Sequence, residues 1–354
     1  MLPFAESNRA YEKWLRERLP LLPADLKRKH AKMAKSAFAF LRGTFFRWVE
    51  AWPEVCAELC AAPRVLGVGD IHIENFGTWR DAEGRLAWGV NDFDEADVLP
   101  YTNDLVRLCT SVVLATDASP ARACVRVLKG YERSLRAGGA PFILGGADHE
   151  WLASLAQIRT EDATAFWPRL QAYGRVTPAS GVRSLLTREL PKRAENLHFV
   201  HRPAGLGSLG RQRIAAVATW DGGLVAREAK TLTVSAVHWQ AKRGGHEIRY
   251  GEIVERAVRA GDPWLKVHGG WVVRRLAPDS RKIEIEELRR SSDLNQFLEA
   301  MGFELGNIHL ATPRQRSTIL RDLKARKPRW LQAATARMAQ ATARDWKDWK
   351  KTET

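Results

Sequence analysis

The spacing of hydrophobic residues divides the chain into helical and β-rich stretches. Before Pro63, apolar side chains recur every three to four positions, a period that predicts helices. Short apolar runs bounded by glycine, proline or aspartate follow, and they predict strands over residues 65–68, 76–79 and 86–90. The helical period returns over residues 103–137, so the first β-rich stretch lies between two helical ones.

A second β-rich block begins near Leu197. Two alternating runs flank Asp221-Gly222-Gly223, a turn sequence that predicts a β-hairpin. A helix over residues 247–259 and two strands over 264–267 and 271–276 follow, and the rest of the chain is mostly helical. A β-rich block between mainly helical regions predicts an α+β protein in two lobes.

We expect four segments of the chain to build these two lobes. They are an N-terminal helical segment (1–63), a large lobe (64–194), a β-rich small lobe (195–280), and helices that complete the large lobe and end in a basic tail (281–354).

The most specific chemical signal is the loop after the first predicted strand, Gly69-Asp70-Ile71-His72-Ile73-Glu74-Asn75. An Asp with an Asn five positions later is the spacing of the kinase catalytic loop, and Asp92 follows the next strand pair, where kinases keep a metal ligand. Phosphoryl transfer needs a carboxylate to receive the proton of the attacking hydroxyl, and oxygen atoms to hold Mg²⁺. We expect Asp70 to be this base and Asn75 and Asp92 to bind the metal. The alternative interpretation is that these residues only cap turns.

Two other residues of these motifs are further candidates. Asp94 is a second metal ligand in one interpretation, and a carboxylate that pairs with a nearby Arg or Lys in the other. His72 is a candidate for a direct role in phosphate or loop geometry, although a histidine in such a loop more often makes structural hydrogen bonds.

A glycine-rich loop supplies the second signal. Gly205, Gly207, Ser208 and Gly210 form a G-x-G-x-x-G motif, which in dinucleotide-binding folds opens a helix. Here a strand pair follows instead, and Lys230 stands at the end of its second strand. This arrangement is typical of the kinase nucleotide clamp, in which backbone and lysine contact the phosphates. The motif therefore predicts ATP and Mg²⁺ as cofactors.

The clamp lysine of a kinase normally pairs with a glutamate on the next helix. Glu247, Glu252 and Glu255 are the candidates on the predicted helix over residues 247–259, and Glu252 and Glu255 share a face of it. Glu255 is the first choice and Glu252 the second. In the alternative interpretation each is a solvated helix charge.

The stretch from Leu66 to Leu105 resembles the aminoglycoside and choline phosphotransferase branch of the kinase-like superfamily. In that branch a Gly-Asp-x-His-x-x-Asn motif precedes a hairpin and an Asp-Trp/Phe-acid motif, which match residues 69–75 and 92–94 here. The resemblance implies that a later Asp steadies the catalytic loop, and Asp104 lies at the corresponding place.

Nearly the whole chain also resembles a bacterial family known only as a domain of unknown function. The shared features are the segment Phe38–Gly43, the catalytic loop, the Asn-Asp-Phe-Asp-Glu motif and the late glycine loop. The resemblance implies a kinase-like fold without an established substrate. Ordinary kinases place the glycine loop before the catalytic loop, whereas this chain reverses them. We therefore expect a circularly permuted kinase-like fold, with the helical catalytic lobe first and the β-rich nucleotide lobe second.

Composition adds expectations about location and partners. The net charge is +15, and residues 314–354 hold 12 Lys and Arg against 4 Asp and Glu, so 12 − 4 = +8. Such a basic tail suits nucleic acid or an acidic partner, although a solvated face of terminal helices carries the same charge. No apolar stretch approaches the ~20 residues of a membrane helix, and the N-terminus lacks the apolar core of a signal peptide. We expect a cytoplasmic protein without a membrane span.

Other functions account for part of these features. A non-catalytic nucleotide-binding module uses the same clamp, and a nucleotidyl transferase uses it with ATP bound in reverse. A metal-dependent phosphoesterase also opens with Gly-Asp-x-His, but it gives no role to the glycine loop or to Lys230. We expect phosphotransfer to an unidentified hydroxyl acceptor, a small molecule or a protein.

Overall fold

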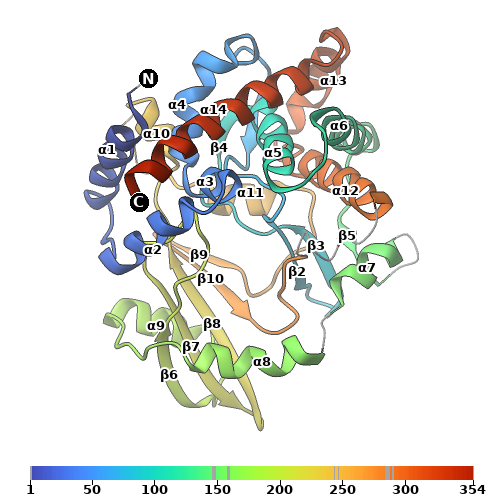
Figure 1. Ribbon diagram of the computed structural model, residues 1–354. Coiled ribbons are helices and arrows are strands. Elements are labelled where there is room, and N and C mark those ends of the chain that lie inside the picture. The colour runs from blue at the N-terminus through green and yellow to red at the C-terminus, as the bar shows by residue number, and fades with distance from the viewer. Residues whose placement is uncertain are drawn as a thin grey trace.

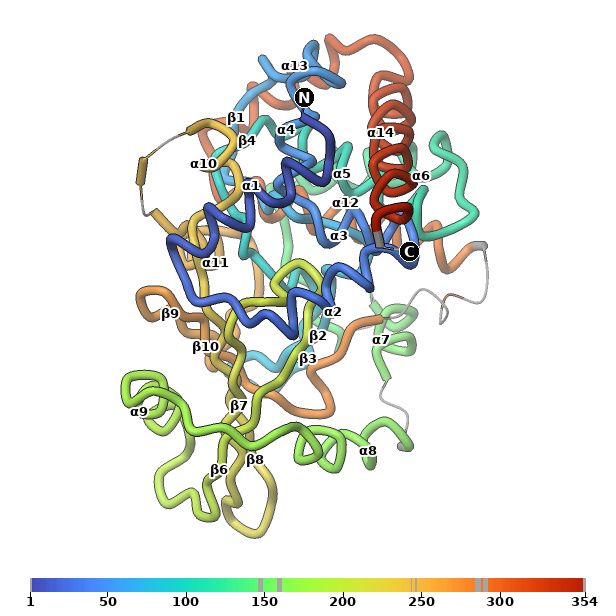
Figure 2. Tube along the Cα trace, turned by 60° about the vertical axis from the view of Figure 1, so that its left-hand side comes forward, coloured from blue at the N-terminus to red at the C-terminus, as the bar shows by residue number. Residues whose placement is uncertain are grey.

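The computed structural model describes residues 2–145, 149–157, 160–242, 244–245, 247–283, 288 and 291–353 (Figure 1). In this part the chain is a mixed α+β protein with three antiparallel sheets, which confirms the predicted class. The largest sheet lies at one end of the molecule, and most helices gather at the other (Figures 1 and 2). None of the described helices is both long enough and apolar enough to cross a membrane.

Four helices form the N-terminal segment. They are α1 (Phe4–Arg16), α2 (Pro23–Met33), α3 (Ala37–Gly43) and α4 (Phe45–Val55). Helix α2 begins at a proline because the first helical position needs no backbone N–H donor. The Ser36 hydroxyl accepts a hydrogen bond from the Ala39 amide at 3.0 Å and caps α3. The rings of Tyr11 and Phe46 stack 4.4 Å apart, so α1 is fixed against α4.

The large lobe combines two small sheets with a helical core. Its strands are β1 (Arg64–Gly67), β2 (Phe76–Arg80), β3 (Leu86–Val90), β4 (Asp97–Pro100) and β5 (Phe142–Ile143). Strand β1 pairs with β4, and the predicted β2–β3 hairpin pairs with β5. The helices of this lobe are α5 (Tyr101–Ala115), α6 (Pro120–Ala137), α7 (Glu150–Ala156) and α12 (Ser291–His309). The core between these elements is apolar and continuous with the N-terminal helices.

Glycines let α6 and α12 approach each other closely. A Cβ on Gly130 would lie 1.9 Å from the Glu299 carbonyl oxygen, and one on Gly302 would lie 2.0 Å from that of Val127. Only glycine fits at such distances. This contact positions α12, and just beyond its end the Thr312 hydroxyl accepts a hydrogen bond from the backbone amide of Leu66 in β1 at 2.9 Å. A late segment of the chain thus ends beside the strand that precedes residues 69–75, the predicted catalytic loop.

The β-rich lobe contains one five-stranded sheet in the order β6-β7-β8-β10-β9. Its strands are β6 (Glu195–His201), β7 (Arg213–Trp220), β8 (Gly223–Thr231), β9 (Lys266–His268) and β10 (Trp271–Leu276). Two short helices, α10 (Ala236–Gln240) and α11 (Tyr250–Arg256), connect β8 to β9. The glycine loop lies between β6 and β7, and Lys230 lies near the end of β8. Both features therefore belong to this sheet, as predicted.

Two helices that the sequence assigned to the large lobe pack on this sheet. They are α8 (Thr160–Gln171) and α9 (Ser180–Arg188). Leu170 is buried in a cluster with Val200 of β6, and Leu186 is buried in a cluster with Phe199. The β-rich lobe of this structure therefore begins with α8, earlier than residue 195. Amphipathic spacing identifies a helix, but it does not tell which sheet the apolar face covers.

The C-terminal residues form integral helices rather than a free tail. Helices α13 (Arg316–Ala325) and α14 (Trp330–Glu353) follow α12, and α14 packs on α3, α4 and α5 (Figures 1 and 2). Leu331, Ala334 and Met338 are buried in this contact. The basic charge of this region is therefore carried by exposed positions on α13, on α14 and in the segments beside them.

Candidate active site

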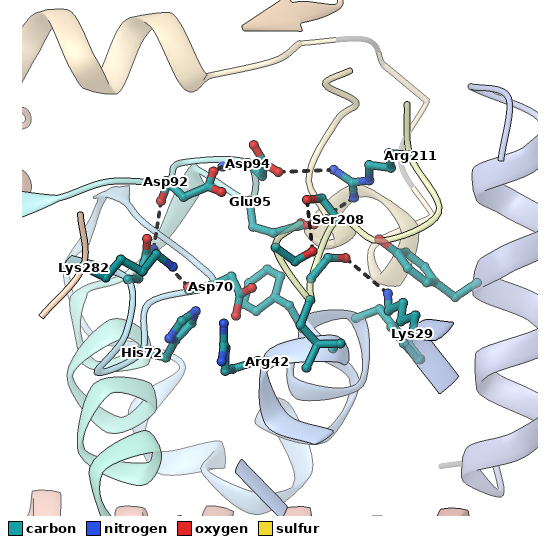
Figure 3. A pocket seen from close by; sticks show the side chains of 18 residues that line it. Lys29, Arg42, Asp70, His72, Asp92, Asp94, Glu95, Ser208, Arg211 and Lys282 are labelled. Carbon is teal, nitrogen blue, oxygen red and sulfur yellow. Dashed lines mark hydrogen bonds and ion pairs between the residues drawn. The ribbon is translucent and has the colours of Figure 1, made fainter. Parts of the chain in front are cut away.

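A cavity of about 60 Å³ lies where the large lobe, the glycine loop and the N-terminal helices meet (Figure 3). Its walls come from stretches of the chain that are far apart in sequence. The lining residues are Tyr11, Lys29, Arg42, Gly43, Phe45, Phe46, Asp70, His72, Asn75, Asp92, Asp94, Glu95, Gly205, Leu206, Gly207, Ser208, Arg211 and Lys282. Both predicted carboxylate motifs and the glycine loop therefore share one cavity.

Asp70 is held at one carboxylate oxygen and faces the cavity with the other. The buried Arg107 donates from Nε and Nη2 to Asp70 Oδ1, at 3.2 and 2.5 Å. Oδ2 faces the glycine loop so closely that a Cβ on Gly207 would lie 3.2 Å from it. Burial raises the pKa of Asp70, and the charge of Arg107 opposes this rise. The geometry leaves Oδ2 in position to accept a proton from a group in the cavity.

Asn75 and His72 complete the same loop. The Asn75 amide nitrogen donates to the carbonyl oxygens of Asp70, at 3.3 Å, and Asp92, at 2.9 Å. Because both partners are acceptors, the amide orientation is set, and Asn75 Oδ1 remains as a metal donor. His72 Nδ1 accepts a hydrogen bond from the Glu74 amide at 3.2 Å, and burial lowers the pKa of His72 well below its usual value. His72 is therefore a neutral, hydrogen-bonded member of the loop near pH 7.

Lys230 connects the β-rich lobe to the candidate metal ligands. Its Nζ lies 2.9 and 2.8 Å from the two Asp92 oxygens and 2.5 Å from Asp94 Oδ1. Burial raises the pKa of both carboxylates, but Lys230 and Arg274 hold the pKa of Asp92 well below its usual range. The pKa of Asp94 stays raised by burial and by the charge of Asp92. Asp92 is thus the firmly ionised member of the pair.

Asp104 supports the start of the predicted catalytic loop from helix α5. It is fully buried, and its carboxylate accepts hydrogen bonds from the Val68 amide at 2.7 Å and the Gly69 amide at 3.1 Å. His309, at the end of α12, lies 3.0 Å from the same carboxylate. These contacts fix the backbone at Val68 and Gly69, and the loop-steadying role that the resemblance implies for Asp104 stays a prediction.

The glycine loop folds as consecutive turns above Asp70. Gly205 has a φ of +75° and Gly210 a φ of +99°, a region that favours glycine. Gly207 leaves no room for a side chain, because a Cβ there would lie 3.1 Å from the Arg42 carbonyl oxygen and 3.2 Å from Asp70 Oδ2. The Ser208 hydroxyl accepts a hydrogen bond from Arg213 Nη2 at 2.9 Å, so the turn is tied to strand β7.

The N-terminal segment holds this loop in place from its outer side. The Leu22 amide donates to the Gly210 carbonyl oxygen at 2.8 Å, and Lys29 Nζ donates to that of Gly207 at 3.2 Å. The cavity beneath the loop is much smaller than the roughly 300–1,000 Å³ of typical ligand pockets. In this conformation the cavity is therefore too small to enclose a nucleotide.

The structure does not bring Lys230 to a helix glutamate. Glu255 is exposed, and Glu252 forms ion pairs with Arg249 at 2.7 Å and Arg256 at 2.8 Å. Lys230 instead meets the aspartates of the large lobe, because its strand ends facing the loop that carries them. Neither glutamate contributes to the site in this conformation.

Several residues of the site were missed from the sequence. Arg107 stands three positions after Asp104 on α5, and Arg211 directly follows the glycine loop. Arg42 belongs to the shared segment Phe38–Gly43, which is the one signal that marked it. Lys29 lies in no recognisable sequence motif.

Glu95 is a further buried carboxylate of the site. Its Oε1 lies 3.3 Å from Arg211 Nη2, and burial raises the pKa of Glu95 to about 7.

The candidate magnesium ligands are oxygen donors of two loops. Within the described residues, no three His, Cys, Asp or Glu side chains gather as a metal site. Asp92, Asp94 and Asn75 Oδ1 instead offer the carboxylate and amide oxygens that Mg²⁺ prefers. The Lys230 ammonium lies against both carboxylates, so this place already holds a positive charge. The donor set fits a magnesium ion once Lys230 releases at least one carboxylate.

The region that carries the catalytic-loop motifs is similar to a family of bacterial proteins. The model of the family described as "Uncharacterized protein conserved in bacteria (DUF2252)" matches residues 18–165, which is less than half of the chain. No curated protein and no solved structure matches the chain.

Proposed function

We propose that this chain is an ATP- and Mg²⁺-dependent phosphotransferase that acts on a hydroxyl acceptor. The observation that carries the proposal is the ion pair between Lys230 and Asp92, which joins the candidate phosphate-binding lysine to the candidate metal ligand. Asp70, Asn75 and the glycine loop line the cavity beside this pair. Each group has a place in phosphoryl transfer, whereas phosphoester hydrolysis gives no role to the glycine loop or to Lys230.

We also propose that the two lobes form a circularly permuted kinase-like fold. The glycine loop and Lys230 come from the five-stranded sheet, and the catalytic loop comes from the helical lobe. In the ordinary kinase order, a helix leads directly into the catalytic loop. Here α12 ends at His309, and the hydrogen bond between Leu66 and Thr312 places this end beside β1. This contact supports a circular permutation in which the direct connection from α12 to the loop after β1 has been cut.

In the proposed reaction the acceptor hydroxyl oxygen bonds to the γ-phosphorus of ATP, the bond to the β–γ bridging oxygen breaks, and ADP leaves with that oxygen. The hydroxyl proton passes to Asp70 Oδ2, while Arg107 holds Oδ1 and orients the carboxylate. Lys230 exchanges Asp92 for a phosphate oxygen. Bound Mg²⁺ supplies charge neutralisation at the phosphates, with Asn75 and Asp92 as its ligands and Asp94 as a further donor.

Labelled ATP distinguishes this function from its alternatives. The protein is incubated with cell extract and Mg²⁺ plus either γ-labelled or α-labelled ATP. Phosphotransfer moves only the γ-label to an acceptor, nucleotidyl transfer moves the α-label, and a nucleotide-binding module moves neither although ATP binds. Transfer of the α-label, or binding without any transfer, would contradict the proposal.

A further inference from the structure

Arg274 on strand β10 holds Asn91, the residue that directly precedes the candidate metal ligand Asp92. Its guanidinium donates from Nη1 to Asn91 Oδ1 at 3.2 Å and from Nη2 to the Asn91 backbone carbonyl oxygen. Two donors of one planar group therefore fix both the side chain and the backbone of Asn91. This contact joins the β-rich lobe to the large lobe independently of the ion pair between Lys230 and Asp92.

The register of the sheet places Arg274 beside Lys230. Val272 of β10 pairs with Lys230 of β8, and Arg274 stands two residues after Val272. Because residues two apart on a strand project to the same side of a sheet, Lys230 and Arg274 share the face that meets the large lobe. Burial raises the pKa of Asp92, but Lys230 and Arg274 together hold this pKa well below its usual range. Both cations therefore lie within electrostatic reach of Asp92.

Asn91 belongs to residues 91–94, which we call the metal loop, and ties this loop to the predicted catalytic loop. The Asn91 backbone amide donates to the Asn75 carbonyl oxygen at 2.9 Å. The Asn75 side-chain amide in turn donates to the Asp92 carbonyl oxygen, also at 2.9 Å. These two bonds fix the candidate ligands Asn75 and Asp92 relative to each other. A shift of Asn91 would therefore move both of them.

Tyr250, the first residue of helix α11, holds Arg274 from its other side and packs on the metal loop. The tyrosine is buried, its hydroxyl accepts a hydrogen bond from Arg274 Nη2, and its ring meets that of Phe93 edge-on at 5.8 Å. Helix α11, on which we expected a glutamate partner for Lys230, thus reaches the metal loop through a tyrosine and an arginine.

We propose that Arg274 is a positioning residue for Mg²⁺, which holds Asn91 so that Asn75 and Asp92 present their oxygen atoms to one ion. The inference rests on the proposed function, because that function assigns the metal to these two ligands. In the proposed reaction Lys230 leaves Asp92 for a phosphate oxygen. Arg274 stays in place, because its hydrogen bonds hold Asn91 rather than the carboxylate. The metal loop therefore keeps its geometry when the ion pair opens.

A magnesium titration of ATP-dependent stability tests this role. The midpoint of thermal denaturation is measured at a fixed millimolar concentration of ATP over a series of free Mg²⁺ concentrations. Arg274→Lys keeps the positive charge but has a single nitrogen, so it loses the paired grip on Asn91. We expect this variant to need at least about tenfold more Mg²⁺ for half of the stabilisation, as is typical when a residue that orients a metal ligand is replaced.

Arg275→Lys is the matched control. Arg275 is the next residue of the same strand, is half-buried like Arg274, and pairs with Asp279 at 2.9 Å, away from the metal loop. This variant should keep the Mg²⁺ requirement of the wild type.

Saturating Mg²⁺ separates positioning from damage to the fold. With excess ion, Arg274→Lys should regain the stabilisation by ATP that the wild type shows, whereas metal does not repair a misfolded site. Tyr250→Phe removes only the hydroxyl that holds Arg274, so it provides a milder second variant. It should raise the Mg²⁺ requirement by itself and add little in the double variant, since both changes act through Asn91.

The outcomes distinguish this inference from the proposed function. If Mg-ATP stabilises the wild type and Arg274→Lys needs no more Mg²⁺ than Arg275→Lys, the positioning role is overturned and the proposed function stands. A loss of stabilisation in Arg274→Lys that saturating Mg²⁺ does not reverse would also overturn the role. If Mg-ATP leaves the wild type unchanged, the proposed function itself fails, and the positioning role fails with it.

Discussion

Lys230 on strand β8 binds both carboxylate oxygens of Asp92, at 2.9 and 2.8 Å, although 138 residues separate the two in the sequence. The lysine is almost fully buried, and Asp94 accepts the same ammonium from a second direction. Two motifs that each predicted part of a phosphate site are therefore joined by a direct ion pair. The pair also links the β-rich lobe to the large lobe at the cavity.

Nucleotide binding is expected to depend on this pair. At a hundredfold excess over its Kd, Mg-ATP should stabilise the wild type by about 2.7 kcal/mol. Lys230→Ala and Asp92→Asn should lose most of that stabilisation, because one removes the phosphate contact and the other a metal ligand. Lys266→Ala, at an exposed position on β9, is the control and should keep it. Thermal denaturation with and without Mg-ATP measures the effect, and a wild type that millimolar ATP leaves unchanged contradicts the clamp.

Asp104→Asn should loosen the catalytic loop. The amide group keeps one acceptor oxygen, but its NH₂ replaces either Oδ2, which accepts from the Val68 amide and faces His309, or Oδ1, which accepts from the Gly69 amide. We expect a loss of about 2–3 kcal/mol in the free energy of unfolding, with a lower ATP turnover. Urea denaturation measures the loss. Asp117→Asn, at an exposed position beyond the same helix, should leave stability unchanged, and equal values for both variants speak against the role of Asp104.

Lys29→Met should make the protein more stable at neutral pH. Burial lowers the pKa of Lys29 from 10.5 to about 8, so the buried ammonium destabilises the folded state by about 3 kcal/mol. The substitution removes this destabilisation, but it also removes the hydrogen bond to the Gly207 carbonyl oxygen, which stabilises the wild type by about 1 kcal/mol. Between pH 8 and 10.5 the unfolded wild type holds more protons than the folded one, so its stability rises relative to the variant. The advantage of Lys29→Met should thus be present below pH 8 and fade by about pH 10.5. Denaturant midpoints across this range test the sign, and a destabilised variant at pH 7 contradicts it.

Removing helix α14 should unfold the large lobe rather than detach a tail. Truncation after Pro328 exposes the core residues that pack on Leu331 and Met338, so we expect little folded protein. Replacing the exposed Lys347, Lys350 and Lys351 by Gln removes charge without this damage and should leave the Mg-ATP stabilisation intact.

The same triple substitution tests partner binding. If the exposed face of α14 binds nucleic acid, the affinity of the wild type should fall steeply with salt, and the triple variant should bind more weakly. Salt-independent binding of nucleic acid, or no binding, leaves this face as a solvated helix surface.

For the truncation after Pro328, a stable folded product would contradict the integral role of α14.

Local patterns predicted the elements of the site better than the contacts between them. The β2–β3 hairpin, the glycine loop and the strand that carries Lys230 follow from spacing alone, because turns and alternation are encoded within a few residues. The partner of Lys230 was sought on the following helix, but it lies in the other lobe, and no short-range pattern encodes that choice. Lys29 could not be singled out among 56 basic residues, since only the fold buries it.

Loss of turnover in Asp70→Asn, measured against a matched substitution, tests the central claim most directly. Asp345→Asn is the match, because each aspartate is 20% exposed and pairs with a buried arginine, Arg107 or Arg47. Both variants lose an ion pair, but only Asp70→Asn loses the proposed proton acceptor. With Mg-ATP binding confirmed in each sample, we predict a fall of about 10²–10⁴-fold in ATP turnover for Asp70→Asn and little change for Asp345→Asn. Turnover of Asp70→Asn equal to that of Asp345→Asn would contradict a phosphotransfer site built on Asp70.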